Sequence, residues 1–217
     1  MVLYCDATSL NIRRDSVAKE ALHIIIGITP EGNKEVLDYA LYPTESPANY
    51  KEMLLNLRER GIEQVLLFVT DGLKGLREAC LEVFPNAKHQ SCWTHITRNV
   101  MKYIRSKDKK AVLDDLKRAY NAATLKEAKS ELYDFLNKYQ SIYPKIVSLL
   151  SYITSLFSFY EFPNEIRKSI YTTNIIENFN KNIKRGTKRK EQLNVMFVVI
   201  VLTIIKNLAL EYIKVLQ

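Results

Sequence analysis

Residues 65–72, Val-Leu-Leu-Phe-Val-Thr-Asp-Gly, decide the fold. Their apolar run is too short for anything but a buried strand, and that strand ends at Thr70-Asp71-Gly72. A second apolar run at residues 2–5 is also followed by an acid, Asp6. An acid at the end of a buried strand is costly without a specific role, because burial disfavours its charged form.

Asp6 and Asp71 meet at one edge of the sheet if their strands are neighbours. Two close carboxylates repel each other, and a bound divalent cation is the usual relief of that repulsion. Either aspartate alone is better explained as a turn or helix-cap residue. The two together, on this order of strands, favour a metal site.

The patterns around these strands predict an α/β fold that opens with an antiparallel meander. Residues 29–33, Thr-Pro-Glu-Gly-Asn, are a strong turn signal, so the strands on either side form a hairpin. Ser46 and Pro47 are typical of a helix start, and Gly61 of a helix end. The expected elements are strands at residues 2–5, 21–28, 36–42 and 65–69, helices at 47–60 and 73–84, and a brief strand at 87–91.

From His95 to about Tyr160 the pattern is helical throughout, with apolar residues three and four apart. The expected helices lie at 111–120, 125–139 and 143–159; another starts at Thr173-Asn174, and a last one runs from Leu193. Three parts follow: the first part of the core at 1–97, an all-helical insertion at 98–165, and C-terminal helices at 166–217 that complete the core. The apolar run at 193–205 is too short to span a bilayer, so we expect a buried helix and no membrane partner.

Glu177 is the candidate for a third acid, which is needed if oxygen ligands are to hold two Mg²⁺ ions. Asn174 and Glu177 also have the spacing of a capping box, so a helix-cap pair is the alternative. The basic residues that follow are Lys181, Lys184 and Lys188, at 4, 7 and 11 residues from Glu177, with Arg185 among them. The three lysines share a helical face with Glu177, which favours a metal site beside a DNA backbone.

A second basic stripe follows His95. Its members at helical spacing are Arg98, Lys102 and Arg105. A solvated helix face is the alternative for either stripe alone. Two such stripes, in a chain with a formal net charge of +8, favour contact with phosphate backbones without sequence-specific base reading. The three cysteines have unrelated spacings, which predicts no disulfide framework and a reducing cytoplasm.

Four stretches match a known family. They are Tyr-Cys-Asp-Ala-Thr at 4–8, Val-Thr-Asp-Gly at 69–72, Gln-Ser-Cys-Trp-Thr-His at 90–95 with Arg98-Asn99, and Ile-Tyr-Thr-Thr-Asn-Ile-Ile-Glu at 170–177. On these motifs the chain resembles the Mutator-type bacterial insertion-sequence transposases, which carry a DDE triad on an RNase H-like fold. The resemblance implies that Asp6, Asp71 and Glu177 form the triad and bind two Mg²⁺ ions, with Mn²⁺ as a substitute. It also implies that the helical block is the family's insertion domain.

The resemblance further implies metal-assisted phosphoryl transfer, in which water or a freed 3′-hydroxyl attacks a DNA phosphate. The expected partners are double-stranded DNA, as element ends and target, and other copies of the chain; the expected location is the cytoplasm, at the nucleoid. Two alternatives stay open: another RNase H-like nuclease, and a non-catalytic DNA-binding remnant. Family members are similar in having an N-terminal helix-turn-helix region, and this chain starts five residues before Asp6. We therefore expect a truncated copy with impaired transposition.

The motif Cys92-Trp93-Thr94-His95 has three interpretations. With His89 it makes a His-x-x-Cys-x-x-His spacing that suggests zinc, but no second pair of ligands accompanies it. Cys92 and Trp93 are also explained by simple core packing. The functional interpretation is that Cys92 and His95, together with Asn174, shape the catalytic pocket or help to place the DNA.

Overall fold

The computed structural model describes residues 1–13, 16–29, 31–152, 155–171, 176–177, 180–181 and 193–194. The chain forms two compact units. The first unit comprises Met1–His89 and Thr173–Gln217, and the second comprises Gln90–Thr172. In sequence, the second unit therefore lies between Asp71 and Glu177.

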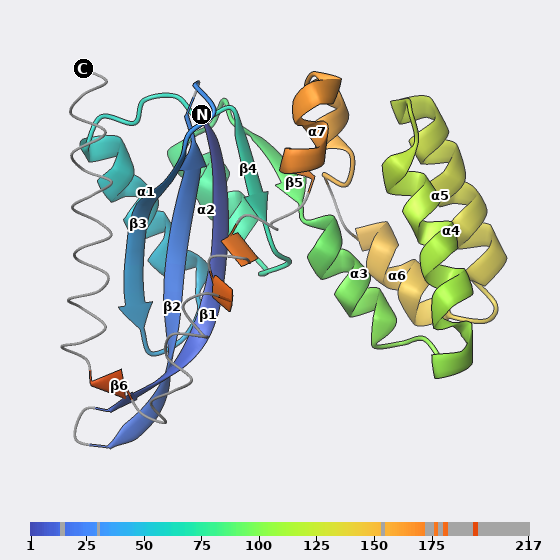
Figure 1. The fold of residues 1–217 in the computed structure, drawn as a ribbon, viewed down its shortest axis with the longest axis horizontal. Helices are drawn as coiled ribbons and strands as arrows, with labels where there is room; N and C mark the ends of the chain where they lie inside the picture. Colours follow the sequence, from blue (N-terminus) through green and yellow to red (C-terminus); the bar gives the residue numbers. More distant parts are fainter. Residues whose placement is uncertain are drawn as a thin grey trace. The chain divides into compact units, whose positions relative to one another are not determined.

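The first unit is built on a mixed β-sheet with the strand order β3-β2-β1-β4-β5 (Figure 1). Its strands are β1 (Val2–Arg13), β2 (Val17–Ile28), β3 (Lys34–Tyr42), β4 (Leu67–Thr70) and β5 (Lys88–Ser91). β2 pairs antiparallel with β1 and with β3, which confirms the predicted meander, whereas β4 pairs parallel with β1. This strand order and these directions form the RNase H-like mixed sheet that the sequence predicted.

β1 is longer than predicted, and Asp6 lies within it instead of after it. The antiparallel ladder to β2 continues as far as Arg13. The shorter β4 pairs with β1 only up to the pair Cys5 and Thr70, where β4 ends. Asp71 therefore leaves the sheet beside Asp6. The register brings the two acids together, although only one of them follows the end of a strand.

Two helices, α1 (Pro47–Glu59) and α2 (Leu76–Val83), cover one face of this sheet (Figure 1). α1 begins at Ser46, whose hydroxyl accepts a 3.2 Å hydrogen bond from the Asn49 amide. α2 begins at Leu76 and not at residue 73, because Gly75 precedes it in the left-handed conformation, with φ of 85°. The core under the two helices includes Leu3, Cys5, Ile25, Leu37, Tyr50, Leu54, Phe68, Leu76 and Cys80.

The opposite face of the sheet carries Asp6 among apolar neighbours. Side chains alternate along a strand, so Asp6 shares this face with Tyr4. Tyr4 pairs with Val69 of β4, and Asp6 pairs with Ile24 of β2. These three apolar side chains are fully buried, and Asp6 itself is only 5% exposed. The strands therefore hold this carboxylate in a poorly hydrated environment.

The second unit is helical. Its helices are α3 (Trp93–Met101), α4 (Lys109–Asn121), α5 (Leu125–Tyr139), α6 (Pro144–Tyr152) and α7 (Asn164–Ile170). α4 and α5 lie side by side (Figure 1), and Thr124 and Glu127 form a capping box at the start of α5. Trp93 anchors the core, because its indole donates a 2.9 Å hydrogen bond to the Leu156 carbonyl and its ring lies 5.0 Å from that of Tyr120.

The helical region differs from the sequence expectation in two places. The helix expected at 143–159 ends at Tyr152, and Ser155 takes a left-handed conformation with φ of 64° before a 3-10 turn at Ser158–Glu161. α7 was not expected, because the sequence pattern indicated no helix between Tyr160 and Thr173. Proline is common beside the first turn of a helix, and α7 begins directly after Pro163.

The C-terminal expectation is wrong where the structure describes it. Leu193–Asn194, which we expected to begin a helix, form β6 and pair parallel with Ile12 and Arg13 of β1. The rest of that predicted helix lies outside the described residues, as does the helix start at Thr173-Asn174. In the described ranges, no helix combines the length and the apolar character needed to cross a bilayer.

Candidate active site

Asp6 and Asp71 form the centre of the candidate site. A carboxylate oxygen of Asp6 lies within 4.8 Å of a carboxylate oxygen of Asp71. Asp6 is buried on β1, and Asp71 is partly exposed directly after β4. Two carboxylates at this separation repel each other when both are ionised.

The pKa of Asp6 is raised in this environment. Burial, and next the charge of Asp71, raise the pKa of Asp6 from 3.8 to about 7, while a backbone hydrogen bond from Ala7 works against the rise. The charges of Glu177 and Glu45 add to it. Near pH 7 about half of this carboxyl group is therefore protonated, since ionisation is opposed by burial and by the neighbouring Asp71 charge.

Local hydrogen bonds orient Asp71. Its Oδ1 accepts a 3.0 Å hydrogen bond from the Leu73 amide, so the turn that follows β4 fixes the side chain. The Thr70 hydroxyl lies 3.1 Å from the Asp71 carbonyl, to which it donates, and 2.9 Å from Nε2 of His89. Burial lowers the pKa of His89 to about 4, so this ring is neutral at pH 7.

Glu177, the third predicted acid, also belongs to the first unit. Residues 176–177 are helical, and Glu177 is 6% exposed. Its charge contributes to the raised pKa of Asp6, which places the third predicted acid in the same electrostatic neighbourhood. The alternative capping role needs Asn174, which lies outside the described residues.

Two residues of this neighbourhood were missed by sequence reasoning. Glu45 follows β3, and burial of its carboxyl group together with the Asp71 charge raises its pKa to about 7, although the residue as a whole is exposed. The available signal was the same as for Asp71, an acid shortly after a predicted strand. Asn180 donates a 2.9 Å hydrogen bond from Nδ2 to Oδ2 of Asp6. Its signal was its position three residues after Glu177.

Carboxylate oxygens are the ligands that Mg²⁺ prefers in proteins. Asp6 and Asp71 supply such oxygens within 4.8 Å of each other, and the negative charge of Glu177 acts on Asp6. The residues present therefore fit a divalent cation.

The predicted DNA-binding residues lie in both units. Lys181 is exposed, while Lys184, Arg185 and Lys188 lie outside the described residues. In the second unit the predicted residues are all exposed: Arg98 lies on α3, Lys102 at its end and Arg105 just beyond it. This unit therefore presents basic side chains to solvent along and after α3.

Cys92 and His95 belong to the start of α3. Cys92 is the residue before the helix, and its Sγ lies within 4.8 Å of a ring nitrogen of His95. Cys92 and Trp93 are each 1% exposed, as the packing interpretation requires. His89, the further ligand that the zinc interpretation needs, hydrogen-bonds to Thr70.

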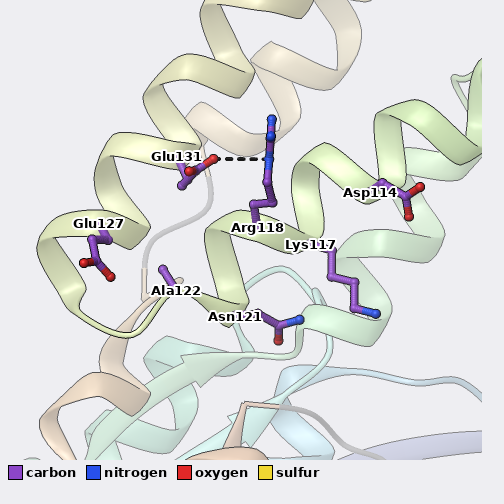
Figure 2. Close-up of a pocket in the computed structure, with 7 residues that line it drawn as sticks. All are labelled: Asp114, Lys117, Arg118, Asn121, Ala122, Glu127 and Glu131. Carbon is purple, nitrogen blue, oxygen red and sulfur yellow. Dashed lines mark ion pairs between the residues drawn. The ribbon is translucent and has the colours of Figure 1, made fainter.

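A separate pocket of about 410 Å³ lies on α4 and α5 of the second unit. Figure 2 shows its lining residues, Asp114, Lys117, Arg118, Asn121, Ala122, Glu127 and Glu131. Arg118 and Glu131 form an ion pair of 3.4 Å, and Glu127 also belongs to the α5 capping box. The lining has three acidic and two basic side chains, so most of its negative charge is offset, in contrast to the acid cluster.

Comparisons with known proteins agree with one another. The sequence profile of the family described as "Transposase, Mutator family" matches residues 1–212. The transposase for insertion sequence element IS905 of Lactococcus lactis is 43% identical over 189 residues, covering 87% of this chain and 48% of that protein. The transposase for insertion sequence element IS1201 of Lactobacillus helveticus is 38% identical over 191 residues, covering 88% of this chain and 52% of that protein.

The chain spans about half the length of the curated relatives it matches. Among solved structures, the catalytic domain of the Mos1 mariner transposase aligns with 68% of this chain and 80% of its own. The sequence identity is 16% and the TM-score 0.30. This similarity is too low to define the fold, which rests on the strand order and directions given above.

Proposed function

Because the chain belongs to the Mutator family of transposases, we propose that it is a DDE catalytic domain that cleaves and joins DNA strands at the ends of an insertion element. The observation that supports this proposal is the proximity of the Asp6 and Asp71 carboxylates, together with the effect of the Glu177 charge on the pKa of Asp6. The three acids come from β1, from the turn after β4 and from a helical segment far along the chain.

In this proposal Asp6, Asp71 and Glu177 hold two Mg²⁺ ions, with Mn²⁺ as an alternative. When bound, such ions make water or a 3′-hydroxyl a stronger nucleophile and stabilise the leaving oxygen of a phosphodiester. Asp6 remains ionised while a cation is present, because the cation offsets the burial that raises its pKa. Asp71 is held in place by the Leu73 amide.

The basic residues supply contacts to the DNA backbone. We assign this role to Arg98, Lys102 and Arg105 with His95 in the second unit, and to Lys181, Lys184, Arg185 and Lys188 after the third acid. Phosphate contacts fix the position of a duplex and do not read its sequence. The substrate is therefore double-stranded DNA, both the element ends and the target, bound by a homo-oligomer at the nucleoid.

The proposed division of the chain follows the acids. Residues 1–97 and 166–217 form the catalytic core, and residues 98–165 are an all-helical insertion between the second and third acids. The packing of α4 against α5, both within residues 98–165, supports a separate helical part.

The direct test is strand cleavage on a supercoiled plasmid that carries the element ends. We expect Mg²⁺-dependent nicking and joining by the full chain, and loss of both in Asp71→Asn, with thermal unfolding unchanged. Asp114→Asn, the same substitution at an exposed acid of the second unit, is the matched control and stays active.

Other outcomes of this assay identify the alternatives. Nicking without any joining points to another RNase H-like nuclease. Mg²⁺-independent binding without cleavage by the wild-type chain identifies a non-catalytic DNA-binding protein and contradicts the proposal.

A further inference from the structure

Asn180 contacts Asp6 directly. Its Nδ2 donates a hydrogen bond of 2.9 Å to Asp6 Oδ2. Chemistry fixes this direction when Asp6 is ionised, because a carboxylate only accepts hydrogen bonds and the amide nitrogen is the only donor on the asparagine side chain. The contact joins β1 to the helical segment that carries Glu177.

Asn180 lies three residues after Glu177, both have helical backbone, and residues three apart share a face at helical spacing. Both side chains are buried, with exposures of 7% for Asn180 and 6% for Glu177. Lys181, the next residue, is exposed. The segment therefore turns one carboxylate and one amide inward and presents a lysine to solvent.

The second heteroatom of the Asn180 amide, Oδ1, is buried and has no hydrogen-bond partner within the described ranges. Thr8, on the same face of β1 as Asp6, is 4% exposed, and its hydroxyl also lacks a partner there. An unpaired buried polar atom is destabilising. The unpaired amide oxygen of Asn180, whose Nδ2 contacts the Asp6 carboxylate, therefore points to a ligand that satisfies it in the working complex.

We propose that Asn180 is a positioning residue for Asp6 and that its amide oxygen is a neutral oxygen ligand of the same divalent-cation site. The inference rests on the proposed function, which assigns the cation to Asp6, Asp71 and Glu177. By holding Oδ2, Asn180 leaves Oδ1 of Asp6 oriented for the cation. Amide oxygens are accepted ligands of hard divalent cations.

The competing explanation is that Asn180 only packs the interior. In that case, replacing it with a side chain of similar size leaves cation affinity unchanged. Asn180→Leu keeps the approximate volume and removes both the donor and the acceptor. Asn180→Ala removes the same groups and the volume. Asn56→Ala, at an exposed position of α1 in the same unit, is the matched control.

The measurement is the affinity of the full chain for Mn²⁺, without DNA, from the electron paramagnetic resonance signal of the free ion. We expect Asn180→Leu and Asn180→Ala to weaken Mn²⁺ binding by about 10–100-fold, the usual effect of losing a residue that orients a metal ligand. Asn56→Ala is expected to bind as the wild type does. Circular dichroism establishes that each variant is folded.

The outcomes separate the two proposals. Wild-type affinity in folded Asn180→Leu overturns the role of Asn180 and leaves the proposed function intact. A wild-type chain that binds no Mn²⁺ contradicts the metal site and this inference with it. If neither variant folds, nuclear magnetic resonance of the wild type decides the question. The Asn180 side-chain amide signals must then shift when Mg²⁺ is added, while those of Asn56 stay in place; no shift overturns the inference.

Discussion

At the scale of single residues, Asp6 links stability to pH. Burial and the Asp71 charge raise its pKa from 3.8 to about 7 in the folded chain. Between about pH 4 and pH 7 the folded state therefore binds more protons at this group than the unfolded state does. The free energy of unfolding contributed by Asp6 falls as the pH rises through this window, and it is lowest above pH 7.

Asp6→Asn is expected to stabilise the metal-free chain at pH 8, because it removes a buried charge next to Asp71. The gain is on the order of a few kcal/mol at most, and it shrinks towards pH 5, where the wild-type carboxyl is mostly protonated. Thermal unfolding at the two pH values measures it. Added Mg²⁺ should raise the unfolding temperature of the wild type at pH 8 and so reduce the difference in stability between the wild type and Asp6→Asn.

An equal or lower stability of Asp6→Asn at pH 8 would show that Asp6 is not under electrostatic strain. Asp114→Asn, at an exposed position, is the control and is expected to change stability by less than about 0.5 kcal/mol at both pH values.

At the scale of elements, the sequence predicted most of the sheet, because short apolar runs and turn signals are local features. The extension of β1 was missed, although Leu10 and Ile12 are buried in alternation with exposed Ser9 and Asn11, a pattern typical of a strand. The register that places Asp71 beside Asp6 is a long-range property of β1 and β4. No local pattern encodes it.

The candidate site, too, could be predicted from the sequence only where local patterns reveal its residues. Asp6, Asp71 and Glu177 were found from strand ends, a basic stripe and the family motifs. Glu45 was overlooked because the adjoining Ser46 and Pro47 explained that stretch as a helix start. The hydrogen bond from Asn180 to Asp6 depends on the packing of a distant segment onto β1, which spacing alone does not reveal.

At the same scale, α3 and the residues just after it are predicted to contact DNA. The triple variant Arg98→Gln, Lys102→Gln and Arg105→Gln should weaken DNA binding and reduce the salt dependence of the affinity. The slope of log K against log salt should fall by about 1 for each DNA phosphate that the variant no longer neutralises. Binding measured by fluorescence anisotropy between low and moderate salt gives both quantities.

The control removes the same charge elsewhere on the second unit. Lys117→Gln, Lys126→Gln and Lys129→Gln alter exposed positions of α4 and α5. A slope that changes equally in both triple variants would mean that net charge alone, and not the α3 residues, governs binding.

At the scale of the whole molecule, each unit has a core of its own. The first unit gathers acids from residues 6, 45, 71 and 177 around one sheet. The second packs its helices around Trp93. The first unit therefore carries the candidate catalytic acids, while the second carries exposed basic residues. This division assigns the proposed chemistry to one unit and part of the proposed DNA binding to the other.

The most direct test of the central claim concerns Glu177, the acid for which the sequence offered a capping role as an alternative. The measurement is the single-turnover rate of Mg²⁺-dependent cleavage of end-containing DNA by Glu177→Gln, which keeps the shape of the side chain. We predict a fall of about a thousandfold or more, as for the loss of one member of other catalytic units, with DNA affinity and unfolding temperature retained. Cleavage within about tenfold of the wild-type rate would contradict a site built on Asp6, Asp71 and Glu177.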